Sequence, residues 1–558
     1  MQRTKIKLLA TSAITLLFSI AILWHFFVVR SRGQAALLLK DRINLLEKTV
    51  EEKMQQQPQT KVVETVVSKC QPWGELQKEV HNCVARVSVY YAEFDWLQPF
   101  KTPRQKEGVG SGFFINEEGD FITNAHVVDE AYSIGIQIPS MGQEIFDAQV
   151  KGVSFDRDLA LVQLSDQAKE RLRSQLGKIP YLQFGDSDII RRADEIMALG
   201  YPLGQEGLKS TIGVVSGKEL DKIQIDAAIN PGSSGGPVLN VDGKVIGISC
   251  SGILSAQNVG YIIPIDELKL IIDDLYKVRF LRRPFLGIIS YPASSELTEF
   301  LKNPEPGGCY VADVFKGSPL HKAGVQAGDM IYQMNGYDID LYGKMKVPWS
   351  EDRITLIDFG GRLKVGEPIL MVVYRNGERK EFKATFDHME LPPVRIMHPG
   401  YDDIDYEIIG GMVIMELTRN HLPLLIGDSM THMKTALLKY EDPKNQFEPT
   451  LIITHLFPGS QACRSRAIFP GMILKEVNGL CVKNLKEFRD SVQKEKNRGF
   501  LTIKTTDNIL VALKIASIIE DEPRLSKDYR YPLTTLTRDL IEREKGGPIS
   551  SFFKRAAN

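Results

Sequence analysis

The sequence predicts a mainly β chain of several domains behind one apolar N-terminal segment. Its 558 residues are too many for a single hydrophobic core. Short β-type runs separated by turn signals fill residues 84–265, and a weakly repeated pattern of Gly, Pro and Asn-Gly turns occurs twice after them. The formal net charge of −1 gives no indication of a nucleic-acid partner.

The N-terminal segment has the length of a membrane span. Three basic residues lie within the first seven positions, an uncharged run covers residues 8–29, and Arg30 and Arg32 close it. As a helix the run would be roughly 33 Å long, about the thickness of a bilayer core. We therefore predict a cytoplasmic stub and an uncleaved signal anchor at residues 1–32, with the rest of the chain outside the cytoplasm. A cleaved signal peptide is the alternative, although only a poor cleavage site follows the run.

The segment between the anchor and the first domain reads as helical. Apolar residues recur between charged ones from residue 35 to about 54, a Gln-rich linker ends at Pro58, and a second helical pattern covers residues 62–81. We expect residues 33–83 to form a stalk or linker.

Residues 84–278 are predicted to form an all-β sandwich or barrel. Turn signals such as Glu118-Gly119 and Asp242-Gly243 separate the runs, and a helix is expected at 267–276. The predicted strands are 84–91, 110–116, 120–123, 133–138, 159–164, 195–199, 211–216, 222–226, 244–249 and 259–263.

Two repeated modules are predicted downstream, at residues 284–386 and 404–515. Each combines a β-type run, a Gly-Ser pair and a final Asn-Gly turn. Residues 516–558 read as a polar C-terminal tail with one short helical pattern and no assigned function.

The six cysteines form no CxxC pair, so we expect no zinc site, and nothing in the sequence calls for a cofactor. Two pairs are close enough in sequence to be disulfide candidates, Cys70 with Cys83 and Cys463 with Cys481. Free buried thiols are the alternative reading.

A Gly-rich segment at residues 230–237 carries the chemistry. It contains Gly232-Ser233-Ser234-Gly235-Gly236, where glycines let the backbone turn so that amides can converge on an oxyanion. Ser234, followed directly by two glycines, is the expected nucleophile, and the amides of Gly232 and Ser234 are the expected oxyanion hole. Ser233 is expected to be a loop hydroxyl. The segment also matches the nucleophile elbow of α/β-hydrolases, but the hairpin expected after it disfavours that fold.

A serine hydroxyl needs a base and an orienting carboxylate. His126 follows a short apolar strand in the first half of the β region, and Asp158 precedes Leu-Ala-Leu-Val, a strand that can hold a carboxylate against an imidazole. Asp156 is the competing acid. The separations of 32 (158 − 126) and 76 (234 − 158) residues let His and Asp come from one half of the domain and Ser from the other.

These motifs, in this order and followed by such a module, resemble the HtrA/Deg family of serine proteases. The residues that carry the resemblance are Thr123-Asn124-Ala125-His126-Val127, Asp158-Leu159-Ala160-Leu161, Gly232-Ser233-Ser234-Gly235-Gly236-Pro237 and Gly317-Ser318-Pro319. The resemblance implies a trypsin-like double β-barrel followed by two PDZ-like α+β domains. It implies ATP-independent endoproteolysis of misfolded or damaged proteins for quality control, in trimers or larger assemblies, with His126 as base, Asp158 as orienting acid and Ser234 as nucleophile.

The resemblance also assigns binding segments. Phe285, Leu286, Gly287 and Ile288 resemble a PDZ carboxylate-binding loop for peptide C-termini, the alternative being a plain strand start. Residues 409–412 are the matching loop of the divergent second PDZ-like domain, for which a structural role is equally open. Residues 93–106 fall where the family has a regulatory loop, and residues 249–257, with Ile253 and Leu254, where a loop lines the primary specificity pocket. The family usually has asparagine at the position of Ser233, a side chain without a chemical role.

The expected partners are unfolded proteins, peptide C-termini, the membrane and further copies of the chain, with no nucleic acid. A proteolytically silent PDZ scaffold or holdase chaperone is the alternative function.

Overall fold

The computed structural model describes residues 73–219, 221–252, 258–428, 431–494 and 499–546. The predicted anchor, the first part of the stalk and the pair Ile253 and Leu254 lie outside these ranges. Over the ranges that are described, no helix combines the length and apolar character needed to cross a bilayer.

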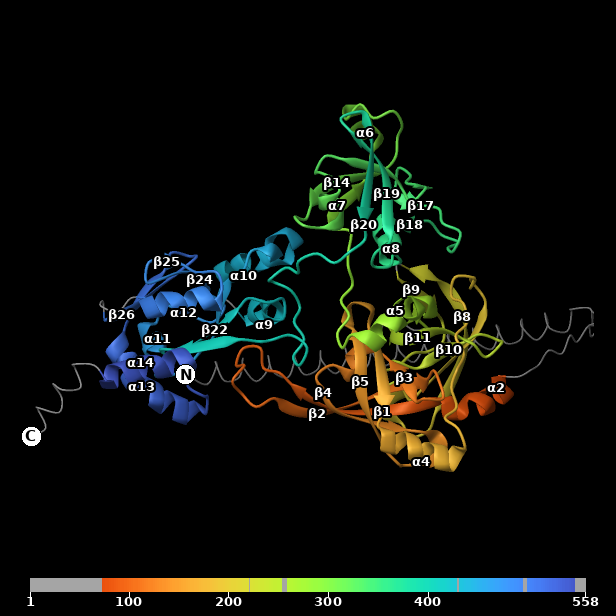
Figure 1. Ribbon diagram of the computed structural model, residues 1–558, viewed down its shortest axis with the longest axis horizontal. Coiled ribbons are helices and arrows are strands. Elements are labelled where there is room, and N and C mark those ends of the chain that lie inside the picture. The colour runs from red at the N-terminus through yellow and green to blue at the C-terminus, as the bar shows by residue number, and fades with distance from the viewer. Residues whose placement is uncertain (1–72, 220, 253–257, 429–430, 495–498, 547–558) are drawn as a thin grey trace, which may run out of the picture. The chain divides into compact units, whose positions relative to one another are not determined.

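The barrel domain consists of two closed antiparallel barrels, which confirms the predicted β architecture of this region (Figure 1). The first has the strand order β1-β2-β3-β6-β5-β4 and the second β10-β11-β12-β9-β8-β7. The strands are β1 (Val84–Glu93), β2 (Arg104–Phe114), β3 (Asp120–Thr123), β4 (Ala131–Gln137), β5 (Phe146–Ser154), β6 (Leu159–Leu164), β7 (Glu195–Gly200), β8 (Lys209–Glu219), β9 (Lys222–Ile225), β10 (Pro237–Leu239), β11 (Val245–Gly252) and β12 (Gly260–Pro264).

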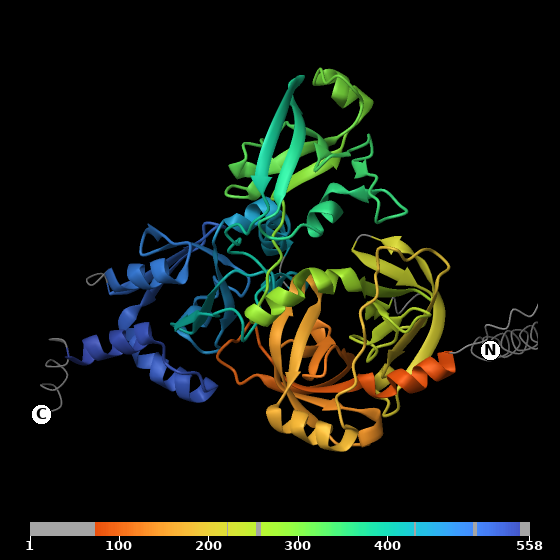
Figure 2. The same cartoon turned by 45° about the vertical axis from the view of Figure 1, so that its right-hand side comes forward.

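Helices close the ends and the outer side of the barrels. They are α2 (Trp73–Val80), α3 (Ala125–Val128), α4 (Asp166–Leu176) and α5 (Ile265–Lys277), with 3₁₀ turns η1 (His81–Cys83), η2 (Pro139–Met141), η3 (Phe155–Arg157) and η4 (Pro202–Gly204). Leu268, Ile271 and Leu275 form the apolar stripe of α5 and are buried in a core shared with both barrels. Figure 2 shows the two barrels side by side, in orange and yellow, with α5 beside them.

Strand β5 and helix α4 were not predicted. In β5 the alternation is interrupted at Val150-Lys151-Gly152, where the pairing with β6 also shifts register. Gly152 is needed there because a Cβ would overlap the backbone of Leu275 in α5. The strand is therefore shaped by a helix that lies more than a hundred residues away in sequence.

The middle domain is a small antiparallel sheet of order β13-β14-β15-β19-β20 with short helices. Its elements are β13 (Ile288–Pro292), α6 (Ser295–Phe300), β14 (Cys309–Val314), α7 (Pro319–Lys322), β15 (Met330–Met334), β16 (Tyr337–Asp338), β17 (Lys344–Met345), β18 (Ile354–Thr355), α8 (Leu356–Gly361), β19 (Pro368–Arg375) and β20 (Glu378–Thr385). Strand β13 lies at the edge of this sheet, so one side of it is unpaired among the described strands.

The C-terminal domain repeats this plan with one strand more, in the order β21-β22-β23-β24-β26-β27. Its elements are β21 (Tyr406–Ile409), β22 (Met412–Glu416), α9 (His421–Asp428), α10 (Thr431–Leu438), η5 (Lys439–Glu441), η6 (Pro443–Phe447), β23 (Leu451–Leu456), α11 (Gln461–Ser465), β24 (Ile473–Val477), β25 (Leu480–Cys481), α12 (Leu485–Lys494), β26 (Phe500–Thr505), β27 (Leu510–Lys514), α13 (Ile515–Tyr529) and α14 (Thr535–Gly546).

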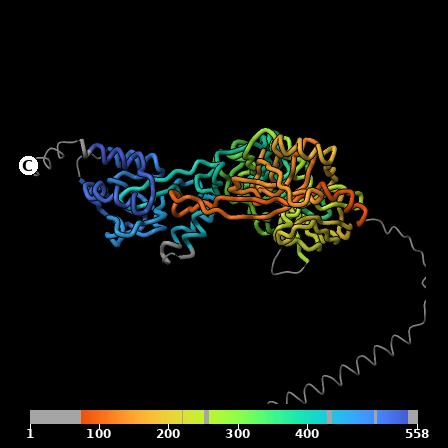
Figure 3. Tube along the Cα trace, turned by 90° about the horizontal axis from the view of Figure 1, so that it is seen from below, coloured from red at the N-terminus to blue at the C-terminus, as the bar shows by residue number. Residues whose placement is uncertain are grey.

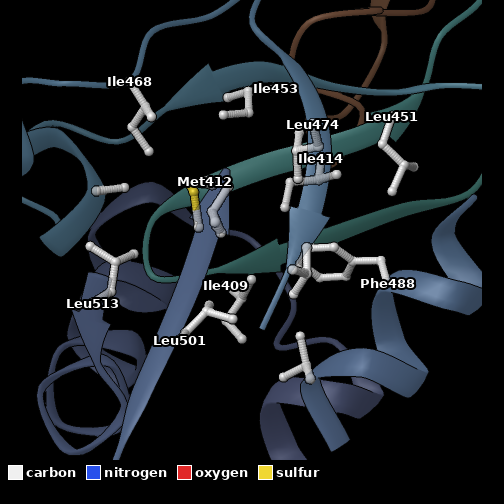
Figure 4. Packing of buried hydrophobic residues seen from close by; sticks show 14 of the residues in the cluster. Ile409, Met412, Ile414, Leu451, Ile453, Ile468, Leu474, Phe488, Leu501 and Leu513 are labelled. Atoms are coloured by element: carbon white, nitrogen blue, oxygen red, sulfur yellow. The ribbon is translucent and has the colours of Figure 1, made fainter. Parts of the chain in front are cut away.

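The core of the C-terminal domain continues past residue 515, where the polar tail was expected to begin. Figure 4 shows Ile409, Met412, Phe488 and Leu513 converging in this core. Ile518 of α13 and Leu536 of α14 belong to the same cluster. Both helices are thus part of the packed domain, because apolar residues of the expected tail pack against the core of the sheet.

The described cysteines form no disulfide with one another; they are Cys83, Cys250, Cys309, Cys463 and Cys481. The Cys463–Cys481 disulfide considered from the sequence is therefore not formed. Cys70, the other candidate partner of Cys83, lies outside the described residues.

Candidate active site and binding grooves

His126 lies in the one-turn helix α3, directly after β3. The preceding residue pair is buried, and the Asn124 side chain donates a hydrogen bond to the backbone carbonyl of Asp158 (2.9 Å). This bond ties the segment that carries the histidine to the segment that carries the aspartate.

Asp158 follows η3 with a positive φ of 54°. Its carboxylate accepts a hydrogen bond from the His126 backbone N–H (3.0 Å), and its two oxygens lie 2.9 and 2.8 Å from His126 Nδ1. The imidazole is therefore held through Nδ1, which leaves Nε2 available to accept or donate a proton. Asp156, the competing acid, instead accepts the backbone N–H of Arg283 (2.9 Å).

Ser234 lies in the loop before β10 and lines the same cavity as His126. Its hydroxyl donates to the carbonyl of Cys250 in β11 (3.4 Å), and within the described part of the chain no hydrogen bond joins it to His126. The hydroxyl has to rotate away from Cys250 before a proton can pass to the imidazole.

The backbone around Ser234 has the features of an anion-binding turn. Gly232 has a φ of +95°, where a Cβ would crowd the carbonyl of Tyr201. The carbonyl of Pro231 accepts the Leu203 N–H (2.6 Å), and the Ser233 N–H donates to Asn230 (2.9 Å). Among the described residues the N–H groups of Gly232 and Ser234 have no acceptor, so both are free to bind an oxyanion.

Ser111 in β2 is a positioning residue that the sequence did not reveal. It is fully buried, its hydroxyl donates to the Gly232 carbonyl (2.7 Å) and accepts the Tyr201 N–H (2.9 Å), and its own N–H donates to the Ser234 carbonyl (2.8 Å). One side chain of the first barrel thus fixes the loop of the second. Locally, Ser111 is only a serine between two glycines in the buried half of β2.

A cavity of about 790 Å³ opens beside these groups. His126, Gly232 and Ser234 line it, and so does Trp96, from the connection between β1 and β2. Leu424 of α9 also lines it. The cleft therefore takes its walls from the barrel domain and from the C-terminal domain.

Phe285, Leu286, Gly287 and Ile288 lead into the edge strand β13 and line a separate cavity of about 520 Å³, together with Gly360 of α8. Gly287 has a φ of +79°, and a Cβ there would overlap Ser318. Edge strand, glycine turn and helix together leave room for an extended peptide beside β13.

The corresponding groove of the C-terminal domain is filled by the chain itself. Strand β21 pairs antiparallel with β22 along the edge that is open in β13, from Tyr406 opposite Met415 to Ile409 opposite Met412. Arg489 of α12 holds β21 from the other side through Glu407 (2.8 Å) and a bidentate pair with Asp405.

A carboxylate from α13 binds the turn at the end of β21. The N–H of Gly410 donates to Glu522 of α13 (3.0 Å), whose other oxygen accepts the Tyr531 hydroxyl (2.7 Å). Gly411 occupies the place of Gly287, since a Cβ there would overlap Ser460 in the same way. Residues 409–412 are thus engaged within the domain, in agreement with the structural role left open for them.

Glu522 predicts a pH-dependent stability. Burial raises the pKa of Glu522 from its ordinary value of 4.5 to about 7. The folded state therefore holds the proton of Glu522 more tightly than the unfolded state does. The contribution of this protonated carboxyl to the free energy of unfolding is complete below about pH 4.5 and is lost as the pH rises through about 7. The free energy of unfolding is expected to fall by on the order of 2 to 3 kcal/mol across this range, and Glu522→Gln to remove most of the slope. Urea unfolding at a series of pH values measures it. The exposed Glu520 of the same helix provides the control Glu520→Gln, and equal slopes in both variants would contradict the expectation.

Comparison with known proteins agrees with this architecture. The family model of the trypsin-like peptidase domain matches residues 110–248, which include His126, Asp158 and Ser234, and that of a PDZ domain matches residues 398–535.

Curated relatives cover most of the chain. A protein of Chlamydia pneumoniae named probable periplasmic serine endoprotease DegP-like is 30% identical over 427 residues, which are 74% of this chain and 77% of that protein. The Bacillus subtilis serine protease Do-like HtrA is 30% identical over 315 residues, 51% of this chain and 65% of its own. Among solved structures, the HtrA-type protease AlgW with decapeptide is 25% identical and covers 58% of this chain and 100% of its own, with a TM-score of 0.45.

Proposed function

The chain belongs to the DegP-like serine endoproteases of the HtrA type, and from this premise we propose that it cleaves unfolded or damaged polypeptides with Ser234, His126 and Asp158. The observation that carries the proposal is the pairing of His126 Nδ1 with Asp158 in the same site as Ser234, whose own N–H and that of Gly232 have no acceptor among the described residues.

In the proposed reaction, His126 Nε2 takes the proton of the Ser234 hydroxyl as its oxygen attacks the scissile carbonyl. Asp158 keeps the Nδ1 proton in place and stabilises the imidazolium. The amides of Gly232 and Ser234 bind the oxyanion, the amine leaves with the proton from His126, and water then hydrolyses the acyl-enzyme.

The middle domain is proposed to bind peptide C-termini. A chain end would add as a strand to β13 while the N–H groups around Gly287 bind its carboxylate. The cavity beside these residues supports this role. The C-terminal domain, whose groove β21 fills, is not assigned a peptide ligand.

We further infer that the barrel domain works outside the cytoplasm, tethered by residues 1–32, and that the chain assembles into trimers or larger oligomers. The name periplasmic in the Chlamydia relative and the apolar run at residues 8–29 support the location. Oligomer size rests on the family resemblance alone.

The test of the proposed activity is covalent labelling. A fluorophosphonate probe should label the full chain at one site, which mass spectrometry of the digested protein places at Ser234. His126→Ala should suppress the labelling, because the hydroxyl then loses its base. Absence of labelling in the presence of unfolded casein would instead favour the silent scaffold.

A further inference from the structure

The connection between β1 and β2 reaches from the barrel domain to the C-terminal domain. Figure 3 follows this hairpin in orange to its tip. Phe100 packs against Phe457 and Tyr531, with ring centroids 5.3 and 5.8 Å apart, and Leu97 packs against the apolar cluster that contains Leu422. Two apolar side chains thus anchor a loop of one domain in another.

A buried hydrogen bond fixes the same loop. His421 at the start of α9 is fully buried, and its Nδ1 accepts the backbone N–H of Thr418 (3.0 Å). The ring proton therefore lies on Nε2, which donates to the carbonyl of Trp96 (3.1 Å). Burial lowers the pKa of His421 to about 4, so the ring is neutral at neutral pH and this bond persists.

These contacts place two apolar side chains in the wall of the active-site cavity. Trp96 packs edge-on against His421, with centroids 5.6 Å apart, and faces the cavity together with Leu424, one turn further along α9. Leu424 is 44% exposed, although it lies beside a buried cluster. An exposed leucine at the mouth of a reaction site offers a contact to an apolar substrate side chain.

The cavity lies on one particular side of Ser234. The hydroxyl rests on the carbonyl of Cys250 in β11, the strand that leads into the loop expected to line the primary specificity pocket. Among the described residues that line the cavity, none belongs to β11. The family resemblance assigns the residues before the scissile bond to the side of β11, so the residues after the bond are expected on the opposite side of Ser234.

We propose that this cavity binds the substrate residues that follow the scissile bond, and that Leu424 and Trp96 select an apolar side chain there. The inference rests on the proposed function and adds a subsite to it. The C-terminal domain, whose own groove is closed by β21, would then act as a wall of the substrate cleft.

Two substrates with the same residues before the scissile bond test the proposal. One is a fluorogenic amide whose leaving group is only the fluorophore. The other is an internally quenched peptide that continues with leucine, or in a matched peptide with lysine, at the second position after the bond. The measured quantity is the ratio of kcat/KM for the extended peptide to kcat/KM for the amide, so that general losses of activity cancel.

Leu424→Asp is expected to lower this ratio about 10-fold for the leucine peptide, and to lower it less or raise it for the lysine peptide, whose ammonium group the new carboxylate attracts. Trp96→Ala should lower the leucine ratio in the same direction. Leu510→Asp, at a 66% exposed leucine of β27 that does not line the cavity, should leave all ratios unchanged. Should Leu424→Asp unfold the domain in a thermal melt, Leu424→Ala gives the same comparison with a smaller change.

Parallel changes for amide and peptide would overturn the inference, because both share the residues before the bond. Unchanged ratios in every Leu424 variant would also overturn it. These outcomes differ from failure of the proposed function, in which the unaltered chain cleaves neither substrate.

Discussion

Ser234→Ala is expected to reduce cleavage of unfolded casein by more than about a thousandfold, since loss of a triad nucleophile costs several orders of magnitude. The fold should be unaffected, because the hydroxyl makes a single 3.4 Å hydrogen bond to Cys250 in the described structure. Casein degradation followed on gels and the thermal midpoint of unfolding measure the two effects.

Ser233→Ala is the matched control for this change. Ser233 is buried and contributes its backbone N–H to Asn230, a bond that alanine keeps. The Ser233→Ala variant should therefore cleave casein at a rate within about threefold of that of the unaltered chain. Residual cleavage above roughly one part in a thousand in Ser234→Ala would refute the nucleophile assignment.

Asp158→Asn is expected to lower kcat by about 10⁴-fold while leaving the fold intact. Asparagine tolerates the positive φ found at this position, so the backbone has no reason to move. Its carbonyl can still accept the His126 N–H, but its amide then donates to Nδ1. The ring proton is forced onto Nε2, which can no longer accept a proton from Ser234. Single-turnover kinetics on a fluorogenic peptide would measure the change.

Asp156→Asn separates the two candidate acids. Its carboxylate binds the backbone of Arg283 and not the imidazole, so a change of no more than a few-fold is expected. A greater loss in Asp156→Asn than in Asp158→Asn would reverse the assignment of the acid.

Local sequence patterns were enough to predict the bounds of some strands of the barrel domain. The bounds of β3 and β6 agree with the runs predicted at residues 120–123 and 159–164, because β3 is buried along its whole length, β6 is buried except at Gln163, and turns bound both strands. The three residues of the expected triad each lie within a few positions of a strand end: His126 after β3, Asp158 before β6 and Ser234 before β10.

Other features depend on partners far away in sequence. Ser111 supports Gly232 across 121 positions, and Gly410 meets Glu522 across 112. The anchoring of Phe100 beside Phe457 is of the same kind. None of these residues stands out locally, since a serine in a strand or a glutamate in a helix is common. Only tertiary packing gives them a role.

The anchoring of Phe100 has a consequence for biosynthesis. Its partner Phe457 is translated 357 residues later (457 − 100), and at about 5–20 residues per second this takes roughly 20 to 70 seconds. The barrels can close and bring the catalytic side chains together during that interval, but the outer wall of the cleft is still missing. A chain interrupted in synthesis or truncated after the middle domain would therefore carry its catalytic groups in an open cleft, and only the full-length chain would present the finished one.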